Sequence, residues 1–296
     1  MTTTLFSTPR DLLRYGVTRF NAAKLFFGHG SAEAIDEAAY LILHTLKLPL
    51  DKLDPFLDAR LLPDEVLQVL AVIERRASER VPAAYITRQA WLGTYAFYVD
   101  ERTIVPRSFI AELIPDSFSP WVEDLYAVDN ILELCTGSGC LAIMMADAFP
   151  NSVIDAVDIS REALEVAQIN IDEYQLQGRV NPIASDLYQN VPFKKYDLIV
   201  TNPPYVNSDS MRRLPQEYLR EPQIALDGGA DGMDLVRQIV AGAAQRLTPN
   251  GLLMVEIGNE REYAEAAFGH LGLTWLTTSA GDDMVFLLTA EQLQHA

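Results

Sequence analysis

Residues 130–149, "NILELCTGSGCLAIMMADAF", decide the fold class of this chain. The apolar run from Ile131 to Leu134 has the length of a buried strand, and the apolar stretch after the glycines has the length of a helix. Gly137 and Gly139 allow the tight turn that such a junction needs. A strand that passes directly into a helix is the repeating unit of an α/β fold.

The same alternation continues to the end of the chain. Strands are predicted at 130–136, 152–159, 180–186, 194–202, 251–258, 273–279 and 282–290, and helices at 137–149, 160–175, 231–247 and 260–271. Alternating strands and helices pair in parallel through right-handed crossovers. The short "AGDD" loop at 280–283 predicts an antiparallel hairpin of the last two strands. We therefore expect a Rossmann-like, seven-stranded, mostly parallel sheet.

The first part of the chain has a different pattern. Residues 1–85 show helical periodicity, with Ser31 expected to cap one helix and Pro63 to begin another. Residues 86–106 are rich in aromatic and β-branched residues around Gly93, which predicts a β-hairpin linker. We expect a small helical bundle at 1–85 that orients a partner molecule or acts as a cap, the linker at 86–106, and an α/β domain at 107–296.

Composition limits the function. The 296 residues are 49% apolar and 22% charged, as in an ordinary globular protein, and carry a formal charge of −18. This charge opposes direct binding to nucleic acid and favours a basic protein partner. Two cysteines and four scattered histidines predict no metal site and no disulfide. The N-terminal residues resemble no signal peptide, and no long apolar run suggests a membrane span, so a cytoplasmic protein is expected.

Three acidic residues end neighbouring strands. Glu133 precedes the glycine loop, Asp158 ends the second strand, and Asp186 ends the third. Ligands of doubly wound sheets bind at these carboxyl ends. Asp158 suits the two hydroxyls of a ribose, Glu133 an ammonium group and Asp186 an adenine amine. S-adenosylmethionine offers all three groups and no phosphate. Exposure of Glu133 on its strand, and a turn or cap at Asp186, are the structural alternatives.

The fourth strand ends in "NPPY", residues 202–205. The two prolines make a stiff, extended exit and leave their carbonyls free as acceptors. The Asn202 side-chain oxygen and the Pro203 carbonyl could accept both hydrogens of one planar NH₂ group, while Tyr205 stacks on its plane. Such positioning favours displacement at a sulfonium methyl without a strong base. The alternative is a purely structural Pro-Pro turn.

These motifs together resemble class I S-adenosylmethionine-dependent methyltransferases that act on planar amino or amide nitrogens. "EPQIALDGGADGMDL" at 221–235, "ERRASERVPAAYITRQAWLG" at 74–93 and "IVPRS" at 104–108 are similar to the HemK family of protein-glutamine methyltransferases. "VPRS" and "LCTGSG" resemble the branch called PrmB more than the release-factor branch. That branch methylates a glutamine of the third large-subunit ribosomal protein, which implies a basic substrate, met before ribosome assembly.

The resemblance also implies roles for residues. The substrate glutamine would be held by Asn202, Pro203, Pro204 and Tyr205, of which Asn202, Pro203 and Tyr205 are catalytic. S-adenosylmethionine, which leaves as S-adenosylhomocysteine, would be bound by Glu133, Cys135, Thr136, Gly137, Ser138, Gly139, Asp158, Asp186, Leu187 and Asn202.

Other readings remain open from sequence alone. Arg107 is a candidate contact for the cofactor carboxylate or an acidic group of the partner, or else a surface arginine. Glu217 and Glu221 are candidates for facing a basic substrate. The alternatives to ribosomal-protein methylation are a release-factor glutamine methyltransferase and an adenine or guanine nucleic-acid methyltransferase. An NAD-binding oxidoreductase built on "GSGCLA" and Asp158 would leave NPPY, Glu133 and Asp186 without a role.

Overall fold

The computed structural model describes residues 6–294 and divides the chain into two units. The helical unit contains the residues up to Ala90 together with 99–101 and 215–220. The sheet unit contains residues 91–98, 102–214 and 221–296. Segment 215–220 lies beyond NPPY in the sequence, yet it packs with the helical unit.

The sheet unit is built on seven strands in the order β5-β4-β3-β6-β7-β9-β8. The strands are β3 (Asn130–Leu134), β4 (Val153–Asp158), β5 (Val180–Ala184), β6 (Tyr196–Thr201), β7 (Leu247–Glu256), β8 (Thr274–Thr278) and β9 (Gly281–Thr289). The first five pair in parallel, and β9 runs antiparallel to both β7 and β8. The predicted mostly parallel sheet and terminal hairpin are confirmed. Strand β7 begins at Leu247, earlier than predicted.

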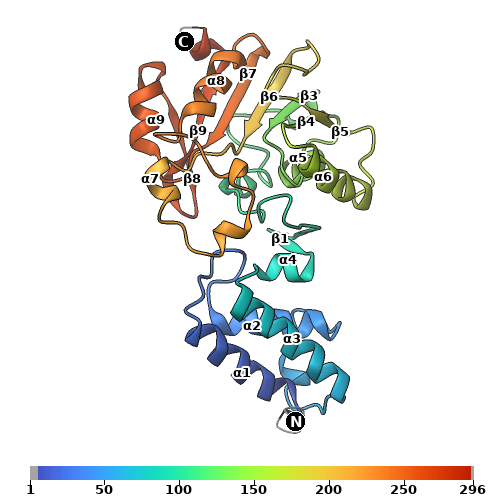
Figure 1. The fold of residues 1–296 in the computed structure, drawn as a ribbon. Coiled ribbons are helices and arrows are strands. Elements are labelled where there is room, and N and C mark those ends of the chain that lie inside the picture. The colour runs from blue at the N-terminus through green and yellow to red at the C-terminus, as the bar shows by residue number, and fades with distance from the viewer. Residues whose placement is uncertain (1–5, 295–296) are drawn as a thin grey trace. The chain divides into compact units, whose positions relative to one another are not determined.

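Helices cover both faces of this sheet (Figure 1). The helices of the sheet unit are α5 (Cys140–Ala148), α6 (Arg161–Glu173), α7 (Ser208–Met211), α8 (Asp234–Ala243), α9 (Arg261–Phe268) and α10 (Ala290–Leu293), with the short 3₁₀ helices η2 (Phe109–Glu112), η3 (Leu125–Ala127), η5 (Gln223–Ala225) and η6 (Gly269–Leu271). Leu132 and Leu134 of β3 share a core with α8, α9 and α10. Because side chains alternate along a strand, Ile131 and Glu133 face the opposite side, where α5 lies.

The strand order reverses between β3 and β6, since the chain leaves β3 toward β4 and β5 and later returns to β6 on the other side. Ligands of open α/β sheets bind at the carboxyl ends of the strands beside such a switch point. The glycine loop follows β3 and NPPY follows β6, so the fold brings the two sequence motifs together.

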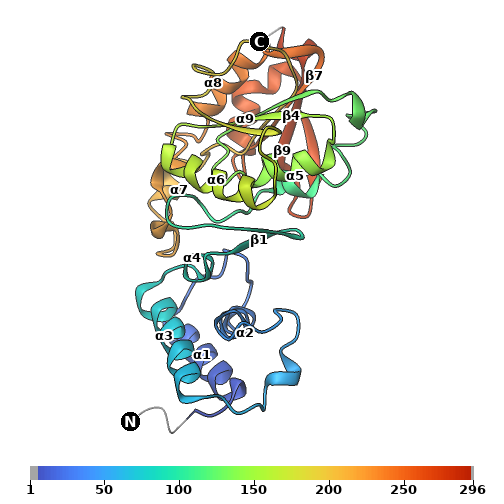
Figure 2. The ribbon, with the colours of Figure 1, turned by 90° about the vertical axis from the view of Figure 1, so that its right-hand side faces the viewer.

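The helical unit contains α1 (Pro9–Ala22), α2 (Ala34–Thr45), η1 (Asp54–Phe56), α3 (Pro63–Glu79), α4 (Ala83–Thr87) and η4 (Tyr218–Arg220). In Figure 2, α2 is seen nearly end-on beside α1 and α3. The three helices enclose a core that includes Phe20, Leu41 and Ile73. Pro63 begins α3 as predicted. The predicted Ser31 cap is wrong, because α2 begins at Ala34 with Glu33 as its N-cap.

Strands β1 (Ala90–Leu92) and β2 (Tyr95–Phe97) form a two-stranded sheet inside the range predicted for the linker hairpin. Asn170 of α6 receives the Tyr98 N–H on its side-chain oxygen at 2.7 Å. Over residues 6–294, no helix is long and apolar enough to cross a membrane.

Candidate functional site

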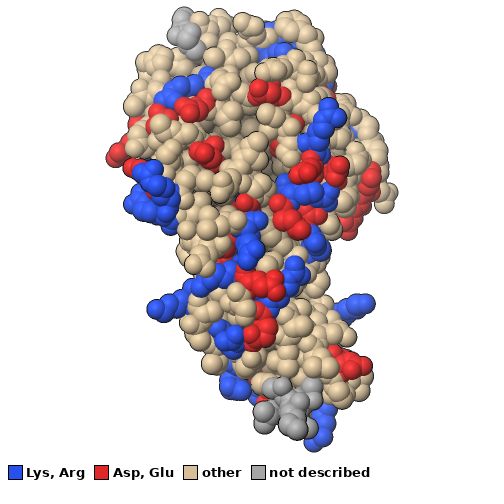
Figure 3. All heavy atoms as spheres, in the orientation of Figure 1, with Lys and Arg blue, Asp and Glu red and all other residues tan. Residues whose placement is uncertain are grey.

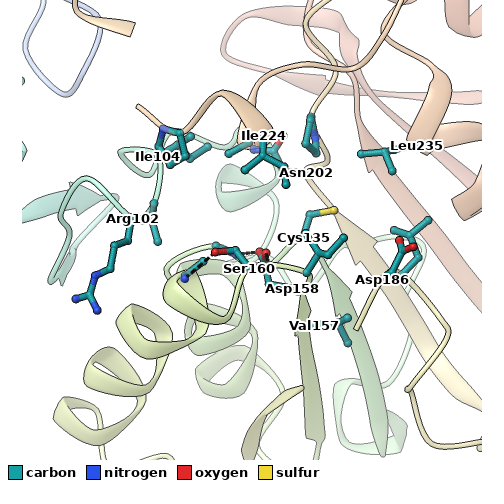
Figure 4. Close-up of a pocket in the computed structure, with 18 of the residues that line it drawn as sticks. Arg102, Ile104, Cys135, Val157, Asp158, Ser160, Asp186, Asn202, Ile224 and Leu235 are labelled. Carbon is teal, nitrogen blue, oxygen red and sulfur yellow. Dashed lines mark hydrogen bonds between the residues drawn. The ribbon is translucent and has the colours of Figure 1, made fainter. Parts of the chain in front are cut away.

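Two adjoining cavities open at the carboxyl ends of β3, β4, β5 and β6. They share Ile104, Cys135, Gly137 and Asn202. Figure 4 shows residues that line the larger one. The larger cavity is lined by Arg102, Thr103, Ile104, Cys135, Gly137, Val157, Asp158, Ile159, Ser160, Ala163, Ser185, Asp186, Leu187, Asn202, Pro204, Pro222, Ile224, Ala225 and Leu235. The smaller is lined by Ile104, Pro106, Arg107, Ser108, Glu133, Cys135, Thr136, Gly137, Ser138, Cys140, Leu141 and Asn202.

The loop after β3 is shaped by left-handed backbone. Gly137 has φ +56°, a value that glycine adopts readily. Cys135 has φ +60°, a value that is uncommon for a residue with a side chain. The Gly137 N–H donates to Oδ2 of Asp158 at 2.9 Å, and the Ser160 N–H donates to Oδ1 at 2.9 Å. Burial raises the pKa of Asp158. Asp158 therefore fixes the loop and also presents its carboxylate to the larger cavity.

Glu133 is buried beneath the smaller cavity, with 2% of its surface exposed. It is therefore not the exposed strand residue of the alternative reading. Its carboxylate accepts hydrogen bonds from the Thr136 hydroxyl and the Ala142 N–H. Burial raises the pKa of Glu133 to about 8, and the charge of Asp158 contributes to the increase. A cationic group in the smaller cavity would favour the ionised carboxylate.

The end of β5 contributes a second side of the larger cavity. Asp186 and Leu187 both line it, and Leu187 has φ +44°. The Gln189 side-chain amide donates to Oδ2 of Asp186 at 2.9 Å, so Asp186 also has the structural bond expected of a turn residue. Ile159 lies on the β4 side of this cavity and leaves 56% of its surface exposed. A cavity lined by an apolar side chain and two carboxylates suits a flat ring with polar edges.

Asn202 lies where the two cavities meet, directly after β6. Figure 4 shows it near Cys135 and above the level of Asp158. Within residues 6–294 its side-chain amide makes no hydrogen bond. The amide is therefore available to a ligand.

The other members of NPPY are placed differently. Pro204 lines the larger cavity, whereas Pro203 and Tyr205 line neither. The Tyr205 ring packs on Gly258: a Cβ added there would lie 2.5 Å from the ring carbon Cε2. Gly139, predicted to bind cofactor, lines neither cavity. It has φ +78°, and an added Cβ would lie 3.2 Å from that of Ala167, so it allows α5 and α6 to pack closely.

Both acidic residues of the segment after NPPY are buried. Glu221 has 3% of its surface exposed and accepts two bonds from Arg107, at 2.6 and 2.7 Å. Glu217 has 1% exposed and pairs with Arg80 at 2.8 Å inside the helical unit. The idea that Glu217 and Glu221 face a basic substrate is therefore wrong. Arg107 is not a lone surface arginine, because it lines the smaller cavity and is held by Glu221.

The cavities are poorly suited to a pyrophosphate. Arg102 and Arg107 are the basic side chains among the described lining residues, and each is paired with a carboxylate, Glu165 or Glu221. No group of three or more potential metal ligands was found among residues 6–294. Sequence reasoning missed several apolar lining residues, including Ile104, Ile224 and Leu235, because they carry no chemical signal and come from distant segments.

Comparisons with known proteins show which proteins this chain is similar to. Residues 121–230 match the family model described as methyltransferase small domain. The chain is 61% identical over 297 residues to the ribosomal protein uL3 glutamine methyltransferase of Burkholderia pseudomallei (strain K96243), covering 98% of this chain and 97% of the relative. It is 59% identical over 287 residues to the protein of that name from Neisseria meningitidis serogroup B, covering 97% and 94%. The solved structure of a methyltransferase from Pyrococcus furiosus is 15% identical with a TM-score of 0.47, covering 66% of this chain and 88% of that one.

Proposed function

Because the chain belongs to the family of ribosomal protein uL3 glutamine methyltransferases, we propose that it methylates the side-chain amide nitrogen of a glutamine in uL3. Identity near 60% over almost the whole of both chains supports this branch over the release-factor branch. The methyl donor in this proposal is S-adenosylmethionine.

The residues that line the cavities fit this donor. When bound, S-adenosylmethionine supplies an electrophilic methyl group on a sulfonium and leaves as S-adenosylhomocysteine. Asp158 would hold the ribose hydroxyls, and Asp186 with Leu187 the adenine. Glu133 would pair with the ammonium group, and Cys135, Thr136, Gly137 and Ser138 would provide the loop against which the donor lies. A pyrophosphate cofactor fits less well, since both lining arginines are already paired.

The proposal rests mainly on the position of the Asn202 side-chain amide. This amide makes no hydrogen bond within residues 6–294, and Asn202 lies where the two cavities proposed for the donor meet. Its side-chain oxygen and the Pro203 carbonyl would accept both N–H groups of the substrate amide, with Pro204 and Tyr205 bounding the amide plane. The nitrogen lone pair would then face the methyl group, and orientation of this kind can contribute several kcal/mol, up to roughly 7–11 in ideal cases.

The reaction step is a single displacement. The amide nitrogen forms a bond to the methyl carbon while the carbon–sulfur bond breaks and its electron pair stays on sulfur. The nitrogen gains acidity as it is methylated and then loses one proton to solvent. Asn202 and Pro203 accept from both N–H groups until the methyl group is transferred; the hydrogen bond of the N–H that then loses its proton ends, and neither residue gains a proton.

The partner in this proposal is a basic ribosomal protein, met free in the cytoplasm before assembly. The net charge of −18 would attract it. On the face drawn in Figure 3, basic side chains are interspersed with acidic ones, so that face offers no continuous basic surface for nucleic acid. For the helical bundle we propose a role in orienting the substrate.

The test is methyl transfer from labelled S-adenosylmethionine to unmethylated uL3 and to a peptide-chain release factor, in parallel. Mass spectrometry locates the added methyl. Asn202→Ala is compared with Asn250→Ala, an exposed asparagine of β7 at the opposite end of the strands. We expect label on one uL3 glutamine, lost with Asn202→Ala and kept with Asn250→Ala. Label on the release factor alone would refute the assignment of uL3 as the substrate, and label on neither protein would refute the proposed function.

A further inference from the structure

A buried carboxylate joins Tyr205 to the turn beside the smaller cavity. Glu256, the last residue of β7, has no exposed surface. Its Oε2 accepts hydrogen bonds from the Ser108 hydroxyl at 2.5 Å, the Phe109 N–H at 2.9 Å and the Ile110 N–H at 3.3 Å. Its Oε1 accepts one from the Tyr205 hydroxyl at 3.4 Å. One carboxylate thus connects two segments that lie about a hundred residues apart in the chain.

The Tyr205 ring is held at a second point by the same end of β7. The backbone of Gly258, at φ +51°, lies against the ring, and only a residue without Cβ leaves that space. The ring face and the hydroxyl therefore both depend on residues 256–258. The hydroxyl bond is longer than the usual O–H···O distance of about 2.7–2.8 Å. Hydrogen bonds of this length at active sites often shorten when substrate binds.

The donors around Glu256 suit an ionised carboxylate, which only accepts hydrogen bonds. Burial raises the pKa of Glu256 to about 7, and the four donors act in the opposite direction. A neutral amide at this position would keep one acceptor oxygen for the Ser108–Ile110 turn and present an NH₂ group to Tyr205. The Tyr205 hydroxyl would then have to accept this hydrogen bond instead of donating it, and the preferred position of the ring would change.

We propose that Glu256 is a positioning residue for methyl transfer, in which Oε1 sets the place of the Tyr205 ring and Oε2 holds the Ser108 turn. The assignment rests on the proposed function, because Tyr205 is taken to bound the substrate amide. Ser108 lines the smaller cavity, so the same carboxylate supports the donor side of the reaction. Glu256 touches neither reactant and acts through its two partners.

The variants Glu256→Gln, Tyr205→Phe and their combination form a double-mutant cycle, with exposed Glu262→Gln of α9 as the matched control. The readouts are KM for uL3, kcat, and the dissociation constant of S-adenosylmethionine from calorimetry. Loss of one hydrogen bond predicts that each single change raises KM for uL3 by about three- to tenfold, with donor affinity within about twofold. The KM of the double variant for uL3 should be no higher than that of the more impaired single variant. Effects that multiply would overturn the assignment.

A second readout does not depend on catalysis. With 3-fluorotyrosine at position 205, the ¹⁹F resonance should shift in Glu256→Gln and stay in place in Glu262→Gln. An unchanged resonance in Glu256→Gln would overturn the inference whichever protein is methylated. If Glu256→Gln does not fold, Tyr205→Phe alone decides: an unchanged KM for uL3 would refute the role of the Glu256–Tyr205 bond. Failure of the wild-type enzyme to methylate uL3 would instead refute the proposed function.

Discussion

Removing the carboxylate of Glu217 should destabilise the helical unit. The Oε1 atom of Glu217 accepts from Arg80 at 2.8 Å, from the Phe26 N–H at 3.2 Å and from Arg76 at 3.5 Å. Arg76 and Glu217 each have only 1% of the side chain exposed. Glu217→Ala therefore takes away an acceptor from a buried guanidinium that water cannot reach, and leaves a small cavity in its place.

The size of the stability loss in Glu217→Ala depends on the hydrogen bonds that Arg76 retains. Breaking a buried ion pair by removing one partner costs about 3–5 kcal/mol. Arg76 retains Glu37 at 2.6 Å and the Phe26 carbonyl at 3.0 Å, so the lower end, about 3 kcal/mol, is expected. Equilibrium urea unfolding followed by far-ultraviolet circular dichroism measures it. The control Glu79→Ala removes an exposed pair with Arg75 and should change stability by less than about 0.5 kcal/mol. A loss of stability below about 1 kcal/mol for Glu217→Ala would contradict the expected cost of removing an acceptor from the buried Arg76 guanidinium.

Three further outcomes are expected. Because burial raises the pKa of Glu133 to about 8, an ammonium group should ionise it on binding, so S-adenosylmethionine binding at pH 7 should release close to one proton. Calorimetry in buffers of different ionisation enthalpy measures this release, and Glu133→Gln should remove it. Gly139→Ala should lower stability by about 1–2 kcal/mol in thermal unfolding, through φ +78° and the contact with Ala167; unchanged stability would contradict that. Gly258→Ala should displace the Tyr205 ring and raise KM for uL3 at least about threefold, whereas an unaltered KM would show that the ring tolerates the added methyl.

Sequence patterns predicted the sheet unit well, because the secondary structure that each segment favours agrees there with the way the segments are connected in the fold. Each strand is a short apolar run and each crossover an amphipathic helix, so the parallel order follows from chirality and connection rules. The start of β7 was missed because "TPNG" reads as a turn, although residues from Leu247 pair with β6. The prediction of Ser31 as a cap is wrong because a cap depends on where the helix begins, which side-chain periodicity locates only within a few residues.

For the candidate site, the sequence indicated the residues next to the strand ends and missed those positioned by distant partners. Asp158 and Asn202 follow strands directly, so the fold alone brings them to one edge of the sheet. Glu217 and Glu221 read as solvent-exposed acids until Arg76, Arg80 and Arg107 are placed around them. No local pattern encodes pairing with an arginine more than a hundred residues away.

In the proposed mechanism Asn202 orients the substrate amide and contributes little to the binding of the donor. A single-turnover experiment with saturating S-adenosylmethionine and saturating uL3 tests it most directly, with Asn202→Ala compared with wild type and Asn250→Ala. We expect the rate of methyl transfer to be at least about 100-fold lower for Asn202→Ala, while the dissociation constant of the donor changes less than about threefold. An undiminished rate, or a loss explained wholly by weaker donor binding, would contradict it.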